Sequence, residues 1–269
     1  MNPHRVVFIG GGNMASALIG GLLKSGRSAT SIGVVEPFET QRNVLSEQFG
    51  IAAQAQADDT VADADMVVWA VKPQLFADAV APCAAFVAGA LHLSVMAGIR
   101  SDALTRATGS ERVVRAMPNT PALIGQGIAG LFARAAVNDA ERAAVEQVLA
   151  PTGALLWVAQ ESDLDAVTAL SGSGPAYVFY FLEAMMQAAV DMGLSEAEGR
   201  TLALSTFAGA TALAAQSHEA VAVLRERVTS RGGTTHAALT SLEGDGVKAA
   251  IVKALRAAQQ RARELGNQY

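Results

Sequence analysis

The first residues of the chain combine a short apolar run, a glycine turn and a helical segment. The apolar run is Val6–Ile9, it leads directly into Gly10, Gly11 and Gly12, and a helical pattern covers residues 13–25. A strand that turns through glycines into a helix is the first half of a βαβ unit, so it favours a parallel sheet with crossover helices. The run is apolar throughout, as is typical of a strand covered on both faces.

The glycine turn also has the spacing of the dinucleotide fingerprint Gly-x-Gly-x-x-Gly/Ala. Gly10 permits the tight turn, Gly12 lets the backbone approach a pyrophosphate, and the small Ala15 lets the helix pack close to its strand. The phosphates then lie at a helix N-terminus, where unpaired N–H groups and the helix dipole favour negative charge. A structural glycine turn without a ligand is the alternative, but the strand before it and the helix after it favour nucleotide binding.

Short apolar runs alternate with helical segments over the first 160 residues. This alternation predicts an α/β domain over residues 1–160 with a Rossmann-like, doubly wound parallel sheet. Strands are expected over residues 6–9, 32–35, 66–71, 91–95, 112–116, 128–132 and 154–158, and helices over residues 13–25, 40–49, 74–86, 101–108 and 139–149.

Beyond the last predicted strand, only helical patterns occur. Pro175 stands at a favoured first helical position, and Ser195 with Glu198 forms a capping box for the next helix. Polar residues interrupt the apolar pattern near residues 159–164, which indicates a domain boundary. We therefore expect an all-α domain over residues 161–269.

The composition argues against several classes of partner. The formal net charge of -5 gives no reason to expect nucleic acid or an anionic membrane. Cys83 is the only cysteine, which excludes an internal disulfide and suits a reducing compartment, and we expect it to be a small buried side chain. The four histidines are scattered without the paired spacing of a metal site, so no metal is expected.

No targeting or membrane segment is expected. The apolar start at Val6 has only the length of a strand and ends in glycines, unlike a signal peptide. Residues 79–99 carry no charge and have the length of a membrane span, but Pro82 and Gly89 interrupt them, so we expect helix, turn and strand there. These observations favour a soluble, cytoplasmic protein.

Glu36 follows the second predicted strand, 24 positions beyond Gly12. An acidic residue at this place usually accepts hydrogen bonds from the adenosine ribose hydroxyls and repels a 2′-phosphate, which favours NADH over NADPH. Arg42 lies only six residues downstream of Glu36, close enough to weaken this preference for NADH. A glutamate that merely belongs to the loop is the alternative.

Two further motifs follow predicted strands, at the carboxyl ends where parallel sheets bind ligands. In Ala70-Val71-Lys72-Pro73-Gln74, Lys72 either faces a phosphate or ribose or is an exposed loop residue. In Met117-Pro118-Asn119-Thr120-Pro121, the prolines stiffen the turn. Asn119 either orients a nicotinamide amide or a substrate there, or belongs to a structural turn.

A second glycine-rich element, Ser230-Arg231-Gly232-Gly233-Thr234-Thr235, precedes another helical segment. Glycines and threonines before a helix start offer free N–H donors and hydroxyl groups. The element lacks the Gly-Lys-Ser/Thr ending of a P-loop, so a carboxylate or another small anion suits it better than a nucleoside triphosphate. A capped turn without a ligand is the alternative.

Taken together, these motifs resemble those of one family. The glycine fingerprint, the motifs at 70–74 and 117–121, the run Ser171-Gly172-Ser173-Gly174-Pro175-Ala176-Tyr177 and the run Val228-Thr229-Ser230-Arg231-Gly232-Gly233-Thr234-Thr235 occur in the order found in pyrroline-5-carboxylate reductases. The chain resembles that family over essentially its whole length, and the last two motifs are specific to it.

The resemblance implies reduction of 1-pyrroline-5-carboxylate to L-proline, the final step of proline biosynthesis, with NADPH as the usual cofactor and NADH as the alternative. It also implies a helical domain that interlocks with a second subunit, so we expect a homodimer that assembles further into a larger homo-oligomer. The implied substrate contacts are Ser230, Gly232, Gly233, Thr234 and Thr235, with Thr235 beside the ring nitrogen as the catalytic residue. The implied cofactor contacts are Ile9, Gly10, Gly11, Gly12, Asn13, Met14, Glu36, Ala70, Val71, Lys72, Pro73 and Ala97.

The chain departs from the family pattern in three places. Many members have proline where Arg231 stands, a His-Pro pair in place of Ala220-Val221, and a serine or another small or basic residue in place of Glu36. Two other functions are alternatives, and 3-hydroxyacid dehydrogenases also join a Rossmann domain to a helical one. A 3-hydroxyacid dehydrogenase needs a lysine in the first helical segment, and residues 163–192 contain none. A protein that binds NAD(P) without turnover is the other alternative.

Overall fold

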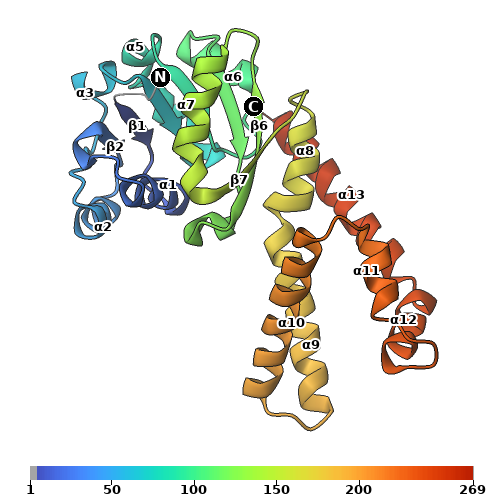
Figure 1. The fold of residues 1–269 in the computed structure, drawn as a ribbon. Coiled ribbons are helices and arrows are strands. Elements are labelled where there is room, and N and C mark those ends of the chain that lie inside the picture. The colour runs from blue at the N-terminus through green and yellow to red at the C-terminus, as the bar shows by residue number, and fades with distance from the viewer. Residues whose placement is uncertain (1–4, 269) are drawn as a thin grey trace. The chain divides into compact units, whose positions relative to one another are not determined.

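The computed structural model describes residues 5–268 and contains one seven-stranded sheet followed by long helices (Figure 1). The chain separates into two compact units. Residues up to Gly174, together with those from Ala258 onward, form the first, and Pro175–Ala257 form the second. The first unit thus extends past the boundary expected near residues 159–164 and also takes in the end of the last helix.

The sheet has the strand order β2-β1-β3-β4-β5-β6-β7. Its strands are β1 (Val6–Ile9), β2 (Ile32–Val35), β3 (Met66–Trp69), β4 (Leu91–Ser94), β5 (Val113–Met117), β6 (Gly127–Ala133) and β7 (Gly153–Trp157). The first five strands pair in parallel, which confirms the predicted α/β class. Strand β6 differs, because it runs antiparallel to β5, and β7 then pairs with it in parallel.

The reversal at β6 follows from the length of the connection before it. Residues 118–126 contain only the short 3-10 helix η3 (Thr120–Ile124). A parallel return needs a crossover of about a dozen residues or more, usually with an α-helix. The predicted parallel sheet is therefore confirmed for the first five strands, whereas β6 and β7 run in the opposite direction to them.

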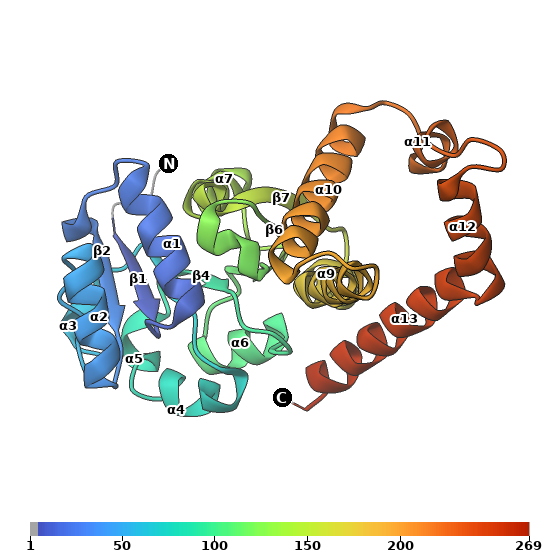
Figure 2. The same ribbon diagram turned by 90° about the horizontal axis from the view of Figure 1, so that it is seen from below.

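Helices cover both faces of the sheet, with an apolar core beneath each layer (Figure 2). One face carries α1 (Asn13–Lys24), α2 (Glu39–Phe49) and α7 (Asp139–Leu149). The other face carries α3 (Asp59–Ala62), α4 (Phe76–Val80), α5 (Ala84–Val87) and α6 (Ser101–Thr108). Because both faces are covered, β1, β3 and β4 are buried along their whole length, which explains the continuous apolar sequences of β1 and β3. Strand β4 also buries two polar residues, His92 and Ser94.

The single helix expected over residues 74–86 is wrong, because the structure divides it around Pro82. Helix α4 ends at Val80 and α5 begins at Ala84. Proline has no N–H to donate, and its ring collides with the carbonyl four residues earlier, so a helix does not continue through it. The uncharged stretch 79–99 is thus helix, turn and strand, as predicted. Among residues 5–268, no helix is long and apolar enough to cross a membrane.

The lone cysteine has the environment expected of it. Cys83 is buried, and its thiol donates to the carbonyl of Ala79 at 3.2 Å. Burial raises the pKa of the thiol to about 11, so almost none of it is the reactive thiolate at neutral pH.

A group of charged side chains binds the segment after β7 to the sheet. Arg115, buried in β5, donates to the Glu161 carboxylate at 2.8 Å. The N–H and the hydroxyl of Ser101, at the start of α6, donate to the same carboxylate at 2.6 and 2.7 Å. Burial alone would raise the pKa of Glu161, but the hydrogen bonds from Ser101 and Arg115 outweigh it and hold that pKa below its ordinary value. Glu161 therefore remains ionised and fixes the chain against α6 and β5.

The second unit consists of helices with little core of their own. They are α9 (Gly174–Asp191), α10 (Glu196–Gln216), α11 (Val221–Arg227), α12 (Thr234–Gly244) and most of α13 (Val247–Gly266). The capping box of Ser195 and Glu198 is confirmed at the start of α10. The buried apolar side chains within 175–257 are only Leu182, Ala189 and Ala203.

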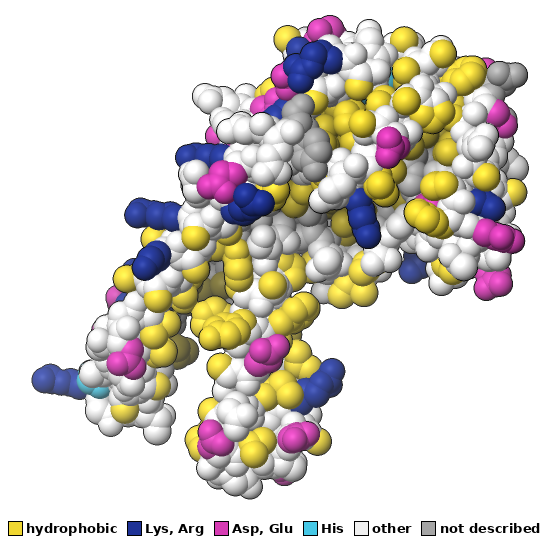
Figure 3. All heavy atoms as spheres, turned by 180° about the vertical axis from the view of Figure 1, so that it is seen from behind, with side chains coloured by type: hydrophobic (Ala, Val, Ile, Leu, Met, Phe, Trp, Pro, Cys, Tyr) yellow, Lys and Arg dark blue, Asp and Glu magenta, His cyan; other side chains and the backbone are white. Residues whose placement is uncertain are grey.

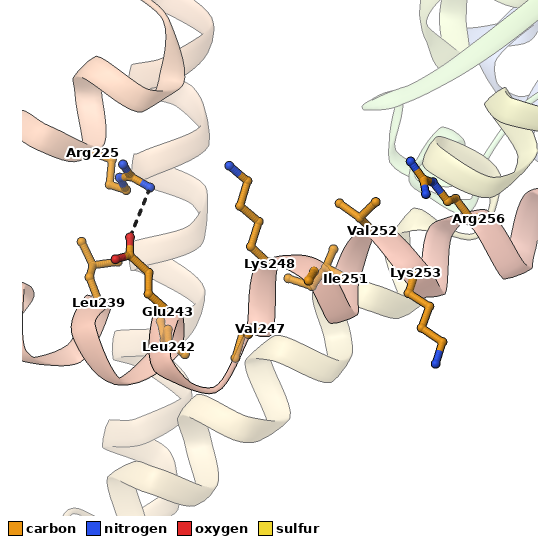
Figure 4. Close-up of a pocket in the computed structure, with 12 residues that line it drawn as sticks. Arg225, Leu239, Leu242, Glu243, Val247, Lys248, Ile251, Val252, Lys253 and Arg256 are labelled. Carbon is orange, nitrogen blue, oxygen red and sulfur yellow. Dashed lines mark ion pairs between the residues drawn. The ribbon is translucent and has the colours of Figure 1, made fainter.

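Large apolar side chains of this unit face solvent instead (Figure 3). Figure 4 shows one open pocket between α11, α12 and α13, where Arg225 and Glu243 form an ion pair of 4.0 Å beside mainly apolar side chains. The apolar residues around this pocket are Leu239, Leu242, Val247, Ala249, Ile251 and Val252. So much exposed apolar surface is typical of a surface that another protein chain covers.

We predict that buried His92 makes the protein less stable in acid. The His92 ring accepts a hydrogen bond from the Trp69 indole at 3.0 Å, and burial, with a smaller contribution from Arg112, lowers its pKa from 6.5 to about 4. Between these values the unfolded chain binds a proton that the folded chain does not. The free energy of unfolding should therefore fall as the pH is lowered through this window, by on the order of 3 kcal/mol in total.

Urea unfolding of wild type and His92→Gln at pH 7 and pH 5 measures this effect. Glutamine keeps an acceptor for Trp69 but does not titrate, so the variant should lose much of the difference in stability between the two pH values. An equal difference in both proteins would show that His92 does not cause the acid sensitivity.

We also predict that Glu161→Gln lowers the free energy of unfolding by about 2 kcal/mol, because it leaves the buried Arg115 guanidinium without its counter-charge. Glu111→Gln is the matched control, since Glu111 pairs with Arg134 but is largely exposed, and the loss there should stay within about 0.5 kcal/mol. Urea titrations compare the two variants. Equal losses would contradict a special role for Glu161.

Candidate functional site

The turn after β1 accepts only glycine at its first position. Gly10 has a φ of +96°, and a Cβ there would lie 2.7 Å from the carbonyl oxygen of Ala70 and 2.9 Å from Val71 Cγ1. The Gly10 N–H donates to the Val35 carbonyl at 2.8 Å. The backbone after β1 is therefore held closely between the ends of β2 and β3.

The helix that follows begins with an open N-terminus. Gly12 is the N-cap of α1, and no side chain caps the helix there. A Cβ on Gly12 would meet no atom within 4 Å, and Gly12 and Asn13 are both exposed. Free N–H groups at the positive end of a helix, next to an open space, fit the pyrophosphate of a dinucleotide.

Gly11, the middle glycine of the turn, is held by side chains that follow β2 in the sequence. The Gly11 N–H donates to Glu36 Oε2 at 2.8 Å, and Gln41 Nε2 donates to the Gly11 carbonyl at 2.5 Å. A Cβ on Gly11 would lie 2.6 Å from Leu45 Cδ1, so the residue must be small. Glu36 is only 6% exposed, and its other oxygen accepts from the Phe38 N–H at 2.9 Å. Its carboxylate thus holds the glycine turn in place.

The other residues expected at the cofactor follow neighbouring strands at the same edge of the sheet. Ile9 pairs with Trp69 in parallel register, and Trp69 pairs with Ser94. The structure therefore brings the turn after β1 together with the segments that follow β3 and β4. In those segments Ala70, Val71 and Pro73 are half-buried, and Lys72 and Ala97 are exposed.

Asn119 lies after β5, and its side chain is engaged with the backbone. Its Nδ2 donates to the Ser171 carbonyl at 3.1 Å, and its Oδ1 accepts from the Ile128 N–H at 3.0 Å. Both polar groups of the side chain are thus already engaged in fixing the backbone, which fits a structural role. A cofactor contact by Asn119 therefore stays a prediction that these contacts do not favour.

The second glycine-rich element lies in the helical unit and has the form of a tight turn before α12. The Gly233 N–H donates to the Ser230 carbonyl at 3.0 Å, and Gly232 has a φ of +73°. A Cβ on Gly233 would lie 2.6 Å from Ser230 Oγ. Gly233 is the N-cap of α12 and no side chain caps it, so the N–H groups of the first turn, including those of Thr234 and Thr235, are open to a small anion.

Two contributors to the site were missed at the level of sequence. Gln41 supports the glycine turn across 30 residues of sequence, and Leu45 limits the size of residue 11. Leu45 belongs to the apolar stripe of α2, which is a weak signal, but nothing local distinguishes Gln41 from other polar helix residues. Among the described residues, no three His, Cys, Asp or Glu side chains are grouped so that they could hold a metal ion.

Two known protein families match the chain, one over the sheet-forming residues and one over the helical residues. Residues 5–98 match the family described as NADP oxidoreductase coenzyme F420-dependent, and residues 161–265 match the one described as Pyrroline-5-carboxylate reductase dimerisation. A pyrroline-5-carboxylate reductase of Pseudomonas aeruginosa is 44% identical over 272 residues, which cover 100% of this chain and 99% of that protein.

Solved structures agree with the sequence relatives. A pyrroline-5-carboxylate reductase from Coxiella burnetii has a TM-score of 0.90 and 34% identity, with 98% of this chain and 99% of that chain covered. A pyrroline carboxylate reductase from Plasmodium falciparum, solved with NADP bound, has a TM-score of 0.88 and 28% identity, with 99% of each chain covered.

The two outer glycines of the turn should respond differently to substitution. Gly12→Val should weaken dinucleotide binding about tenfold or more and lower the free energy of unfolding by no more than about 1 kcal/mol, because its Cβ enters open space and valine is only a poorer N-cap than glycine. Gly10→Ala should destabilise the protein by more than about 1 kcal/mol, because of its positive φ and the contact with Ala70. Calorimetric titration and urea unfolding separate the two effects. Unchanged cofactor affinity in Gly12→Val would remove Gly12 from the site.

Proposed function

The chain belongs to the pyrroline-5-carboxylate reductase family, and we propose that it reduces 1-pyrroline-5-carboxylate to L-proline with NADPH at its two glycine-rich helix N-termini. The observation that carries this proposal is the presence of both elements in one chain that matches its relatives from end to end. One element suits the pyrophosphate of a dinucleotide, and the other suits the carboxylate of a small imino acid. The reaction is the last step of proline biosynthesis.

The cofactor is assigned to the edge of the sheet where β1, β3 and β4 end. In this assignment the N–H groups after Gly12 receive the pyrophosphate, while Gly10, Gly11 and Glu36 fix the turn that presents them. When bound, the nicotinamide supplies the hydride that reduces the imine carbon. The full set of assigned residues is Ile9, Gly10, Gly11, Gly12, Asn13, Met14, Glu36, Ala70, Val71, Lys72, Pro73 and Ala97, with Asn119 as the weakest member.

The substrate is assigned to the turn before α12. The N–H groups and hydroxyls of Ser230, Thr234 and Thr235, with Gly232 and Gly233 shaping the turn, bind the substrate carboxylate. This contact orients the ring. The imine nitrogen must carry a proton to accept hydride well, and the Thr235 hydroxyl, directly or through water, holds that proton in position.

The helical unit is assigned to self-association. Its helices bury only three apolar side chains within 175–257 and expose many large ones, and the family whose description matches this part of the chain is named for dimerisation. We infer a homodimer in which these helices cover those of a second copy, assembled further into a larger homo-oligomer in the cytoplasm. Size-exclusion chromatography with light scattering tests the assembly.

The activity itself is tested with the purified protein by following the oxidation of NADPH or NADH. We expect oxidation with 1-pyrroline-5-carboxylate and formation of proline, and none with a 3-hydroxyacid and NADP⁺ or NAD⁺ in the reverse direction. Binding of the dinucleotide without turnover of the imine would contradict the proposed reaction and favour a non-catalytic role.

Thr235→Ala should lower kcat/KM by about tenfold to hundredfold, the effect of one hydrogen bond to a charged group, and Thr235→Ser should restore most of it. Thr240→Ala is the matched control, because Thr240 lies on the same helix and its hydroxyl only donates to the His236 carbonyl. Steady-state kinetics with the natural imine compare the three variants. Unchanged kinetics in Thr235→Ala would remove Thr235 from the site.

A further inference from the structure

A cation lies at the corner between β2 and α2 without an acidic partner. Arg42 Nη1 donates to the carbonyl oxygens of Glu36 at 3.0 Å and Pro37 at 2.7 Å. Among the described residues Arg42 forms no ion pair, and its Nη2 and Nε make no hydrogen bond. The guanidinium is therefore fixed at one nitrogen, while the rest of its planar group stays available.

This position is not explained by the stability of the helix. Helix α2 begins at Glu39, so Arg42 lies in its first turn, where the positive end of the helix dipole disfavours a cation. The carbonyl oxygens at the end of β2 hold the side chain there instead. A group of negative charge beside this corner would satisfy both the guanidinium and the helix end.

Glu36 is not placed to exclude such a group. Each of its carboxylate oxygens already accepts a backbone N–H, from Gly11 at 2.8 Å and from Phe38 at 2.9 Å, and the residue is almost completely buried. A glutamate that accepts hydrogen bonds from the ribose hydroxyls must present its oxygens to the ligand, and Glu36 has almost no exposed surface. Here the Glu36 carboxylate stabilises the glycine turn, and Arg42 is the charged group with free donors at this corner.

We propose that Arg42 is the specificity-determining residue for the cofactor, and that it binds the 2′-phosphate of the adenosine ribose and so selects NADPH over NADH. This inference rests on the proposed function, because it assumes that the dinucleotide lies along the ends of β1 and β2. A guanidinium fixed at one nitrogen loses little further freedom when its remaining donors bind a phosphate. Arg42 thereby favours NADPH, whereas the position of Glu36 in the sequence alone would favour NADH.

Calorimetric titration of the full-length protein with NADP⁺ and NAD⁺, and with adenosine 2′,5′-bisphosphate and AMP, tests this role. Wild type should bind the 2′-phosphorylated member of each pair more tightly. In Arg42→Gln this advantage should fall by about tenfold or more, and Arg42→Lys should keep part of it, because the charge remains but the planar set of donors is lost. Arg106→Gln is the matched control, since Arg106 pairs with Asp102 on α6 and lies largely exposed.

Three results would overturn the assignment. The first is a wild-type protein that shows no preference for the 2′-phosphorylated nucleotide. The second is an Arg42→Gln variant with the same preference as wild type. The third is a loss of affinity in Arg42→Gln and Arg42→Lys that is equal for the nucleotides with and without the 2′-phosphate. The last would mean that Arg42 only supports the loop. Reduction of 1-pyrroline-5-carboxylate by wild type with either cofactor is measured in parallel, so that failure of this inference is distinguished from failure of the proposed reaction.

Discussion

The close approach of two backbone segments at the ends of β1 and β3 determines the geometry of the nucleotide side of this protein. Any side chain at residue 10 would collide with the carbonyl of Ala70, so the chain turns there through glycine. That turn leaves Gly12 open and the first turn of α1 without a side-chain cap. Because Glu36 fixes Gly11 from the other side, the N–H groups are already oriented before any ligand arrives. Binding then needs little rearrangement of the backbone.

A second constraint holds the segment after β7. Glu161 joins the buried Arg115 of β5 to the start of α6, and Arg100 pairs with Asp165 at 2.9 Å a few residues later. The end of α13 also lies against this cluster, because a Cβ on Gly266 would be 2.5 Å from Arg100 Nε. These bonds explain why the compact first unit continues to Gly174 and includes the last residues of the chain, whereas the polar character of residues 160–163 alone suggested only a boundary.

The features that sequence reasoning predicted are those encoded locally. The glycine turn, the strand and helix around it and the capping box of Ser195 depend on residues only a few positions apart, and the structure has them at the expected places. The reversal of β6 depends on the length of one connection, and the division at Pro82 depends on a single residue inside an otherwise helical pattern. The contacts of Gln41 with Gly11 and of Glu161 with Arg115 join residues 30 and 46 positions apart, so no pattern of neighbouring residues predicts them.

The scarcity of buried side chains in α9 to α12 has a consequence for how the protein is made. The sheet unit has two full apolar layers and can complete its folding from a single chain. The helices between Pro175 and Ala257 lack such a layer, so the burial that orders them must come from an encounter with another surface. If that surface belongs to a second copy, as proposed above, the last step of folding joins two chains and is second-order in protein concentration. Its rate then depends on the concentration of chains whose sheet unit has already folded.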